Sequence, residues 1–203
     1  MVLAAPVLTG QHVELVPLSV EHVDGLVRAA TGDRSSYGFT EVPDGPDAMA
    51  AYIAKLLDLR DRSAAAPFVQ RRTVDGRLVG CTRFLEPRWW RGRAEPDEVE
   101  IGGTWLAADA QRSPINTEAK LLLLGHAFDE WGVVRVALVT DCRNERSRGA
   151  IERIGARFEG VLRHHRPSTV RDELGRPRDT AVYAITDDDW PTVRRRLTAR
   201  LAA

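Results

Sequence analysis

The alternation of apolar and polar residues predicts strands and helices in a definite order along the chain. Residues 12–18 alternate between the two kinds, as a half-buried strand does. Residues 19–32 carry an apolar stripe at helical spacing and end in Thr-Gly, where glycine tolerates the left-handed geometry of a helix end. Residues 46–59 open with proline, which is favoured at the first helical position, and again repeat apolar residues with the helical period. We therefore predict one strand followed by two helices.

Strands predominate in the middle of the chain. Asp75-Gly76 separates two alternating runs, 68–73 and 77–85, and this pair is among the strongest short-range signals for a β-hairpin. The segment 86–97 is too long and too polar for a tight turn, so we expect an exposed excursion there. The residues Glu98–Leu106 predict the next strand.

Beyond residue 106, helices and strands alternate. The predicted elements are a polar loop (107–116), a helix (117–131), a strand (134–140), a short helix (144–154), a strand (156–162), a polar turn region (164–177), a last strand (180–185) and a C-terminal helix. The long helix has one apolar face, which we expect to pack on the sheet, formed by Leu121, Leu124, Phe128 and Trp131. This order predicts the α/β (α+β) class, a mixed sheet with helices on both faces.

Composition limits the classes of protein that the chain can represent. Its 203 residues suit a single domain over residues 1–203 with a substantial core. The 29 basic and 29 acidic residues cancel, so no overall field indicates nucleic acid or a membrane as partner. No segment approaches the roughly 18 apolar residues of a membrane span. Cys81 and Cys142 form neither a disulfide framework nor a metal-binding spacing. We expect a cytoplasmic protein without a metal.

The start of the long helix is the first candidate binding feature. Backbone N–H groups are free at a helix start, and the helix dipole is positive there, so the loop Gln111–Asn116 and this start suit an anion. Arg112 can add charge to a bound phosphate. Ordinary capping by Asn116 or Thr117 is the alternative, because most helix starts bind nothing.

The start of the short helix is the second candidate. Asn144 is a good N-cap, and Ser147 lies beside it in the first turn. Capping explains Asn144 but leaves the presence of Ser147 unexplained. The surrounding residues include many arginines, for which anion binding and a solvated helix face remain alternatives. The chain has no G-x-G-x-x-G motif after a strand, no Walker A motif and no G-x-S-x-G elbow.

From Glu100 to Gly160 the chain resembles the GNAT acyltransferase superfamily, and within it the Rim-type branch, which is similar to ribosomal-protein N-terminal acetyltransferases. The resemblance rests on motifs in matching order and spacing: Glu100-Ile101-Gly102 leading to Trp105-Leu106, Asn116-Thr117-Glu118-Ala119, Asn144-Glu145-Arg146-Ser147, Ala150-Ile151-Glu152-Arg153-Ile154-Gly155-Ala156 and Phe158-Glu159-Gly160.

The resemblance implies a GNAT fold with a splayed, mostly antiparallel mixed sheet and acetyl-CoA as co-substrate. Acetyl-CoA is then expected between the strands at 98–106 and 134–140, with backbone groups near Trp105 and Leu106 pairing with its pantetheine. The pyrophosphate is expected on the backbone of Gln111, Arg112, Ser113, Ile115, Asn116 and Thr117. This loop lacks the glycines that the family usually has, and Pro114 removes one N–H donor.

Acetylation of an amine requires a base for the ammonium and an acid for the departing thiolate. Glu100, on the strand beside the expected acetyl-CoA, is the predicted base, and Glu98 is the second candidate because it shares the same strand face. Ser147 is similar in position to the family's serine near the thioester sulfur, and Asn144 to its asparagine that contacts pantetheine. For Glu100 the alternative is a structural pair with a nearby arginine.

The resulting prediction is an enzyme that transfers an acetyl group from acetyl-CoA to a primary amine. A protein N-terminal α-amino group is the leading acceptor by resemblance, and a metabolite amine or an aminoglycoside-like drug are the alternatives. The other class that remains is a non-catalytic acyl-CoA-binding or ligand-sensing module on the same fold. Trp89, Trp90 and Glu98 are predicted to contact the substrate. For the tryptophans, contact within a homodimer and packing onto the core are the alternatives.

Overall fold

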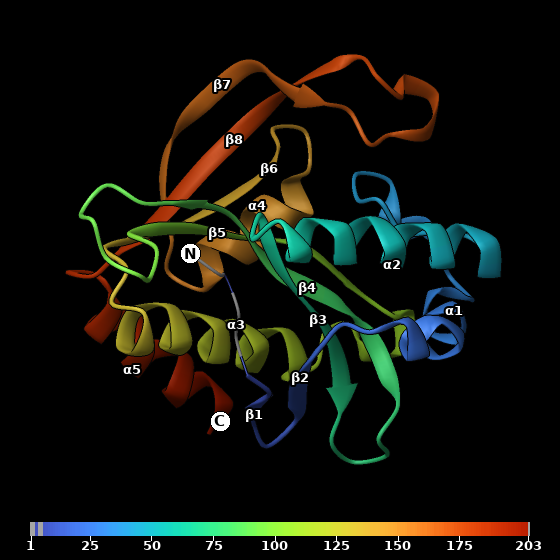
Figure 1. The fold of residues 1–203 in the computed structure, drawn as a ribbon, viewed down its shortest axis with the longest axis horizontal. Coiled ribbons are helices and arrows are strands. Elements are labelled where there is room, and N and C mark those ends of the chain that lie inside the picture. The colour runs from blue at the N-terminus through green and yellow to red at the C-terminus, as the bar shows by residue number, and fades with distance from the viewer. Residues whose placement is uncertain (1–2, 4–5, 203) are drawn as a thin grey trace.

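The computed structural model describes residue 3 and residues 6–202. The described residues contain one eight-stranded sheet with the order β1-β2-β3-β4-β5-β6-β8-β7 (Figure 1). Its strands are β1 (Leu8–Thr9), β2 (Val13–Pro17), β3 (Ala65–Arg72), β4 (Leu78–Arg88), β5 (Glu98–Leu106), β6 (Arg135–Asp141), β7 (Arg157–Pro167) and β8 (Pro177–Thr186). The helices include α1 (Val23–Ala30), α2 (Pro46–Asp61), α3 (Ile115–Gly125), α4 (Glu145–Arg153) and α5 (Trp190–Leu201).

Helices cover both faces of the sheet, as predicted. Helices α1 and α2 pack on each other and on β4 and β3, whereas α3 packs on α5 and on the first two strands. Figure 1 shows α1 and α2 to one side of the central strands and α3 with α5 to the other. Within the described part of the chain, no helix combines the length and the apolar character needed to cross a membrane.

One pair of strands differs from all the others in the sheet. Strands β5 and β6 run parallel, and every other neighbouring pair is antiparallel. The parallel pairing runs only from Glu98↔Arg135 to Glu100↔Ala137, although both strands continue beyond it. The sheet therefore opens after Glu100, which confirms the splayed, mostly antiparallel sheet of the GNAT fold.

The helix predicted over residues 117–131 begins earlier and changes character near its end. It starts at Ile115, its N-cap is Pro114, and no side chain caps it, so the alternative of a cap by Asn116 or Thr117 does not hold. The fixed backbone of proline suits a helix entry, which explains the earlier start. The segment His126–Glu130 is a π-helix that continues α3.

Strand β7 is longer than the predicted strand over residues 156–162. Its pairing with β8 resumes after an irregularity in register between Leu162 and Arg166. The polar residues there were expected to form turns, but the partner strand supplies backbone hydrogen bonds that the local sequence does not reveal.

Helix α3 is tied to the first strands by the buried carboxylate of Glu118. That carboxylate accepts backbone hydrogen bonds from Gln11 (2.8 Å), His12 (2.6 Å) and Val13 (2.9 Å). A Cβ atom on Gly10 would lie 2.4 Å from the Glu118 carboxyl carbon, so only glycine leaves room for this contact. Because hydrogen bonds to a charged acceptor are strong, the start of α3 is held firmly against the sheet.

Candidate active site

The separation of β5 and β6 opens into a cavity of about 1090 Å³. It is lined by the second halves of β5 and β6, the loop before α3, the starts of α3 and α4, the end of α5, and residues of α2, β4, β7 and β8. Its acidic lining residues are Glu41 and Glu100, against nine basic ones: Lys55, Arg83, Arg112, Lys120, Arg146, Arg153, Arg166, Arg178 and Arg200. The cavity is therefore strongly positive, although the whole chain is neutral.

The loop before α3 lines the cavity as predicted, with one exception. Gln111, Arg112, Ser113, Asn116 and Thr117 all border it. The side chain of Ile115 instead lies in the hydrophobic core at 3% exposure, which leaves only its backbone to face a ligand.

Without glycine in this loop, Arg112 itself takes the left-handed backbone conformation, with φ 58°. Ser113 donates a hydrogen bond through its hydroxyl to the carbonyl of Ala110 (2.6 Å). The turn is thus built by a non-glycine residue and a local side-chain contact.

Gln111 connects the loop to three other elements. Its amide nitrogen donates to the hydroxyl of Ser36 and to the carbonyl of Leu106, each at 2.9 Å, and its oxygen accepts from Arg146 of α4 (2.6 Å). The Leu106 carbonyl also accepts from the Tyr37 hydroxyl (2.9 Å). Pairing of pantetheine with this carbonyl would therefore compete with two side-chain donors.

Trp105 borders the same part of the cavity. Its carbonyl accepts from the buried side chain of Gln70 (3.2 Å). Its indole N–H is buried and has no acceptor among the described residues. Since an indole nitrogen only donates, this N–H suits a ligand that presents an oxygen.

Helix α4 begins as the sequence predicted. Asn144 is its N-cap, and the side-chain oxygen accepts from the backbone N–H of Ser147 (3.0 Å). Both residues line the cavity. The Ser147 hydroxyl makes no hydrogen bond within residues 6–202, so it remains available to a ligand.

Glu100 lies where the two strands part, and its side chain is paired with an arginine, as the structural alternative required, although the sequence did not indicate which arginine. Arg166 of β7 donates two hydrogen bonds to this carboxylate, at 3.1 and 2.7 Å. Burial raises the pKa of Glu100, and Arg166 opposes the rise. A Cβ atom on Gly102 would lie 2.9 Å from the carboxylate, so this glycine leaves the space that Glu100 occupies.

A second charged group lies over the next glycine. Gly103 has φ 55°, and a Cβ atom there would lie 2.3 Å from the guanidinium of Arg83. Arg83 donates to the hydroxyl of Tyr52 (3.1 Å). Burial raises the pKa of Tyr52 to about 12, so that hydroxyl stays protonated. The two adjacent glycines of β5 thus make room for the Glu100 carboxylate and the Arg83 guanidinium.

Lys120 is a further cavity residue that the sequence did not reveal. It is buried, and its ammonium donates to the hydroxyls of Thr104 (2.7 Å) and Thr82 (3.4 Å). Burial lowers the pKa of Lys120 to about 7. A lysine inside an amphipathic helix is normally exposed, so no sequence pattern would have singled it out.

Three residues predicted to contact the substrate lie outside the cavity. Glu98 precedes the opening of the sheet and pairs with Arg135 (3.2 Å). Trp89 donates to the carbonyl of Ala94 (3.2 Å) within its own loop, and Trp90 is 55% exposed. The reason is local, because the buried carboxylate of Asp97 accepts the backbone N–H groups of Trp90 (2.6 Å) and Arg91 (2.8 Å) and so organises this loop.

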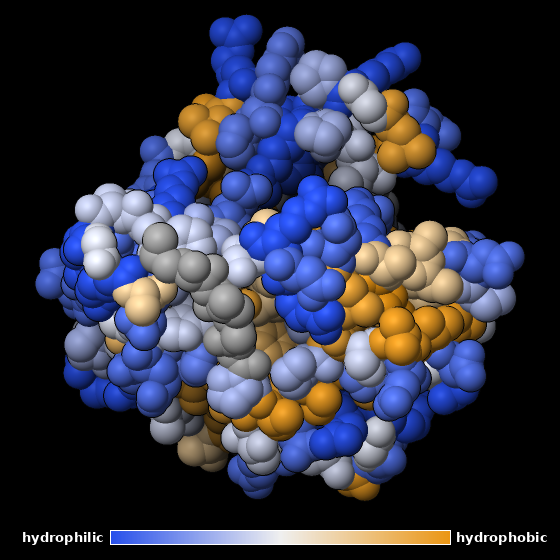
Figure 2. All heavy atoms as spheres, viewed as in Figure 1, coloured by the Kyte–Doolittle hydropathy of each residue, from blue (hydrophilic) through white to orange (hydrophobic). Residues whose placement is uncertain are grey.

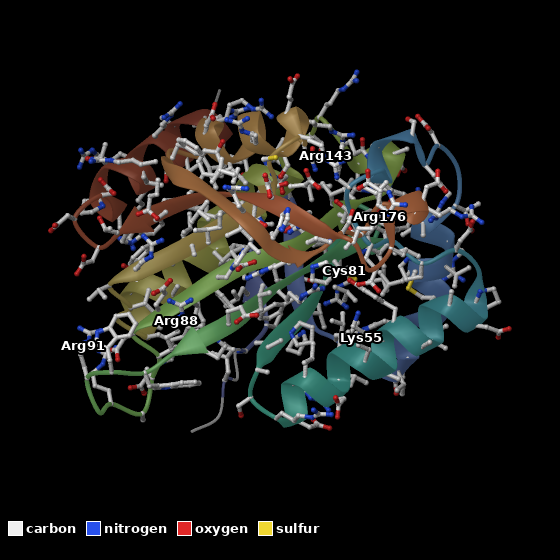
Figure 3. The ribbon with its side chains drawn as sticks, turned by 90° about the horizontal axis from the view of Figure 1, so that it is seen from above. Lys55, Cys81, Arg88, Arg91, Arg143 and Arg176 are labelled. Atoms are coloured by element: carbon white, nitrogen blue, oxygen red, sulfur yellow. The ribbon has the colours of Figure 1, made fainter. Side chains whose placement is uncertain are left out.

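Figure 3 shows Arg88 and Arg91, which flank this tryptophan pair in the sequence, toward the left edge of the molecule and apart from Lys55 and Arg143. A contact between subunits remains the alternative for the exposed Trp90. Cys81 is buried and Cys142 partly buried, and both are free thiols. The described residues contain no group of three or more His, Cys, Asp or Glu side chains that could hold a metal ion.

Comparison with known proteins agrees with this geometry. The sequence model of the family described as an acetyltransferase (GNAT) domain matches residues 12–157. No curated protein matches the chain.

Solved structures resemble the chain over nearly its whole length. A GCN5-related N-acetyltransferase from Brucella melitensis shares 27% identity over 97% of this chain and 85% of that one, with a TM-score of 0.82. A protein from T. thermophilus, provisionally designated an acetyltransferase, shares 33% identity over 99% of this chain and 100% of that one, with a TM-score of 0.81. RimJ of Mycobacterium smegmatis, in complex with CoA-disulfide, shares the fold at 23% identity over 93% of this chain and 88% of that one (TM-score 0.75). The chain therefore belongs to the GNAT family of acetyltransferases, enzymes that use acetyl-CoA.

Proposed function

We propose that this protein transfers the acetyl group of acetyl-CoA to a primary amine that enters beside Glu100. The observation that carries the proposal is the separation of β5 and β6 after Glu100↔Ala137, which opens the cavity between a buried carboxylate and two helix starts. One side of that cavity suits a long anionic donor, and the other suits the acceptor.

The residues near the starts of α3 and α4 fit acetyl-CoA. Arg112, Arg146, Arg153 and Arg200 border this side of the cavity, and CoA carries phosphates that guanidinium groups bind well. Backbone N–H groups at the two helix starts add donors for the same anions. The unpaired indole N–H of Trp105 supplies one more donor.

We assign Glu100 as the base, acting directly or through a water molecule, and Ser147 as the acid. Acetyl-CoA supplies the acetyl group as an activated thioester. Glu100 removes one proton from the ammonium, and the neutral amine nitrogen then forms a bond to the acetyl carbon. The carbon–sulfur bond breaks, and the nitrogen releases its second proton to solvent to give the neutral amide. The hydroxyl of Ser147 gives a proton to the departing thiolate and regains one from solvent. Its freedom from protein partners supports this role.

The acceptor follows from resemblance to the Rim-type branch, which favours an α-amino group such as a protein N-terminus. A small-molecule amine is the alternative. We further propose that residues 1–203 act as one domain, since one sheet contains all the described strands. The two free thiols support a reducing, cytoplasmic setting.

The rival function is a non-catalytic acyl-CoA sensor on the same fold. The loop without glycine and the occupied carbonyl of Leu106 favour it, whereas Glu100 and Ser147 at the cavity favour an enzyme. Titrating acetyl-CoA by calorimetry, and then offering an amine library with detection of released thiol, separates the two. Binding with release of CoA supports the enzyme, binding without any turnover supports the sensor, and no heat contradicts both.

A further inference from the structure

We infer that the acceptor amine carries an anionic group, a carboxylate or a phosphate, and that Arg178 binds this group. The inference rests on the proposed function, because it assigns the chemical class of the second substrate in the same cavity. It depends on one arginine that lines the cavity without a counter-ion.

Arg178 lies on β8, directly opposite Arg166 of β7 in the strand pairing. Within the described residues it makes no ion pair and no side-chain hydrogen bond, and its buried Nε has no acceptor. A guanidinium carries five N–H donors, and a partly buried charge without an anion is unfavourable. Burial also lowers the pKa of Arg178, which is the direction expected for a cation removed from water. Among the described residues, the guanidinium of Arg178 thus has no direct anionic partner beside the proposed reaction site.

The nearby carboxylates already accept hydrogen bonds from other arginines. Asp141 accepts from Arg143 at 3.0 and 2.8 Å, and Glu100 accepts from Arg166 at 3.1 and 2.7 Å. Both acids lie near enough to attract Arg178, but neither forms an ion pair with it among the described residues. An incoming anion is therefore the natural partner of Arg178.

The charged residues around the acceptor side of the cavity, the part next to Glu100, also favour an acceptor with an anionic group. Four cations border it, Lys55, Arg83, Arg166 and Arg178, against the two carboxylates of Glu41 and Glu100. Arg83, like Arg178, has no carboxylate partner among the described residues, and its side chain donates a hydrogen bond to the Tyr52 hydroxyl. An acceptor that brings only positive charge meets repulsion here, whereas an amine that also carries an anion is attracted. A polycationic drug is accordingly the least suitable acceptor.

Arg178 belongs to the acceptor side rather than to the acetyl-CoA side. It comes from the β7–β8 hairpin, which contacts the segment after α1 through a hydrogen bond from the Thr169 hydroxyl to the Phe39 carbonyl (3.0 Å). The arginines assigned to acetyl-CoA come from the α3 loop, α4 and α5 instead. Figure 2 shows mostly hydrophilic residues over the β7–β8 part of the molecule, with some apolar residues among them.

The test uses paired acceptors, one member of each pair carrying the anionic group and the other lacking it. The full chain is given saturating acetyl-CoA and either member of three pairs: phenylalanine and phenylalaninamide, β-alanine and β-alaninamide, O-phosphoethanolamine and ethanolamine. Two tripeptide amides, Ala-Ala-Ala and Asp-Ala-Ala, test whether a peptide can supply the anion. The readout is the ratio of kcat/KM within each pair, from thiol release and product mass.

We expect the anionic member of at least one pair to be preferred by about tenfold or more, because a site built for a polar group rejects an analogue that lacks it. Arg178→Gln should reduce that ratio about tenfold while leaving kcat/KM for the neutral member within about twofold. Arg176→Gln, at an exposed arginine two positions away, should leave the ratio unchanged. Arg178→Lys should retain part of the preference, and it replaces the glutamine variant if that one does not fold.

Equal or greater reactivity of the neutral members in every pair overturns the inference, and so does a preference that survives Arg178→Gln. If the protein binds acetyl-CoA but acetylates only uncharged peptides or polyamines, the proposed function stands and this inference is overturned. A protein that binds acetyl-CoA and acetylates no probe overturns the inference as well. Failure to bind acetyl-CoA removes the proposed function itself.

Discussion

The guanidinium of Arg166 on β7 donates one hydrogen bond to each oxygen of the Glu100 carboxylate on β5, at 3.1 and 2.7 Å. In the sheet order β6 and β8 lie between these two strands. The contact therefore spans the opening where β5 leaves β6, and it connects the β7–β8 hairpin to the point where the base is proposed.

Replacing Arg166 should change the pH at which the enzyme becomes active. Burial raises the pKa of Glu100 and Arg166 lowers it, so Arg166→Gln leaves burial less opposed and raises this pKa further. A base must be deprotonated, and the acidic limb of kcat/KM against pH should therefore move to higher pH by about one unit. Initial rates across the pH range measure the shift.

Arg163→Gln is the matched control, because Arg163 lies on the same strand and is exposed. Its profile should coincide with that of the wild type. Glu100→Gln should remove the acidic limb and lower kcat about 100-fold. An acidic limb that stays in place in Arg166→Gln would show that Glu100 is not the titrating base.

Ser147→Ala should separate turnover from binding. The capping bond from the Ser147 backbone to Asn144 does not involve the hydroxyl, so α4 should keep its start. We expect kcat to fall at least about tenfold and the Kd of acetyl-CoA to change less than about threefold, because only proton donation is lost. Asn144→Ala is the contrasting variant and should destabilise the fold by about 1 kcal/mol through loss of the cap. A collapse of affinity with unchanged kcat would assign Ser147 to binding alone.

Gly103→Ala should disturb the acceptor side through Arg83. The added Cβ would lie 2.3 Å from that guanidinium, and φ 55° disfavours any side chain. We expect a higher KM for the acceptor together with a stability loss of about 1 kcal/mol. Gly175→Ala is the matched control, since its φ of 81° imposes similar strain but nothing lies within 4 Å of the added atom. Identical kinetics in the two variants would remove the proposed effect on Arg83.

Lys120→Met should alter how stability depends on pH. The pKa of Lys120 falls from 10.5 to about 7 on folding, so between these values the unfolded chain binds more protons than the folded one. The wild-type free energy of unfolding should therefore increase as the pH rises from about 7 to 10.5. At lower pH the folded protein keeps the buried charge and its full destabilising effect. Lys120→Met should be more stable than the wild type at low pH, by on the order of 3 kcal/mol. This advantage should vanish as the pH approaches 10.5, the ordinary pKa of lysine.

Urea unfolding at a series of pH values measures this difference. Lys55→Met serves as the control, because Lys55 is 58% exposed in its side chain and pairs with Glu41 at the surface. Unlike Lys120, it lies at the surface, so this variant reports the loss of a surface ion pair rather than of a buried charge. A pH-independent difference for Lys120→Met would mean that the lysine is hydrated in solution.

The parts of the fold that sequence reasoning predicted are those specified by neighbouring residues. The hairpin at Asp75-Gly76, the helix beginning with Pro46 and the cap at Asn144 each depend on the chemistry of a few adjacent positions. The opening between β5 and β6 came from resemblance to the family, because no local pattern reports where two strands stop pairing.

The missed site residues depend on contacts between distant segments. Arg166 lies in a stretch expected to form turns, and it reaches Glu100 only because β7 pairs with β8 beyond an irregular register. Lys120 became a buried residue because Thr82 and Thr104 meet its ammonium across the sheet. In the opposite sense, the aromatic character of Trp89 and Trp90 suggested a binding wall, but the position of their loop is set by Asp97.

The contact between Glu118 and the first strands has a consequence for biosynthesis. The backbone N–H groups of Gln11, His12 and Val13 find their acceptor more than a hundred residues later in the chain, at separations of 107, 106 and 105 positions. A ribosome delivers the N-terminal end first, so this turn must wait for α3 to emerge before its native partner exists. The first strands are therefore expected to reach their native arrangement late in synthesis. A stall in translation before residue 118 would leave them without the Glu118 carboxylate that binds their backbone N–H groups.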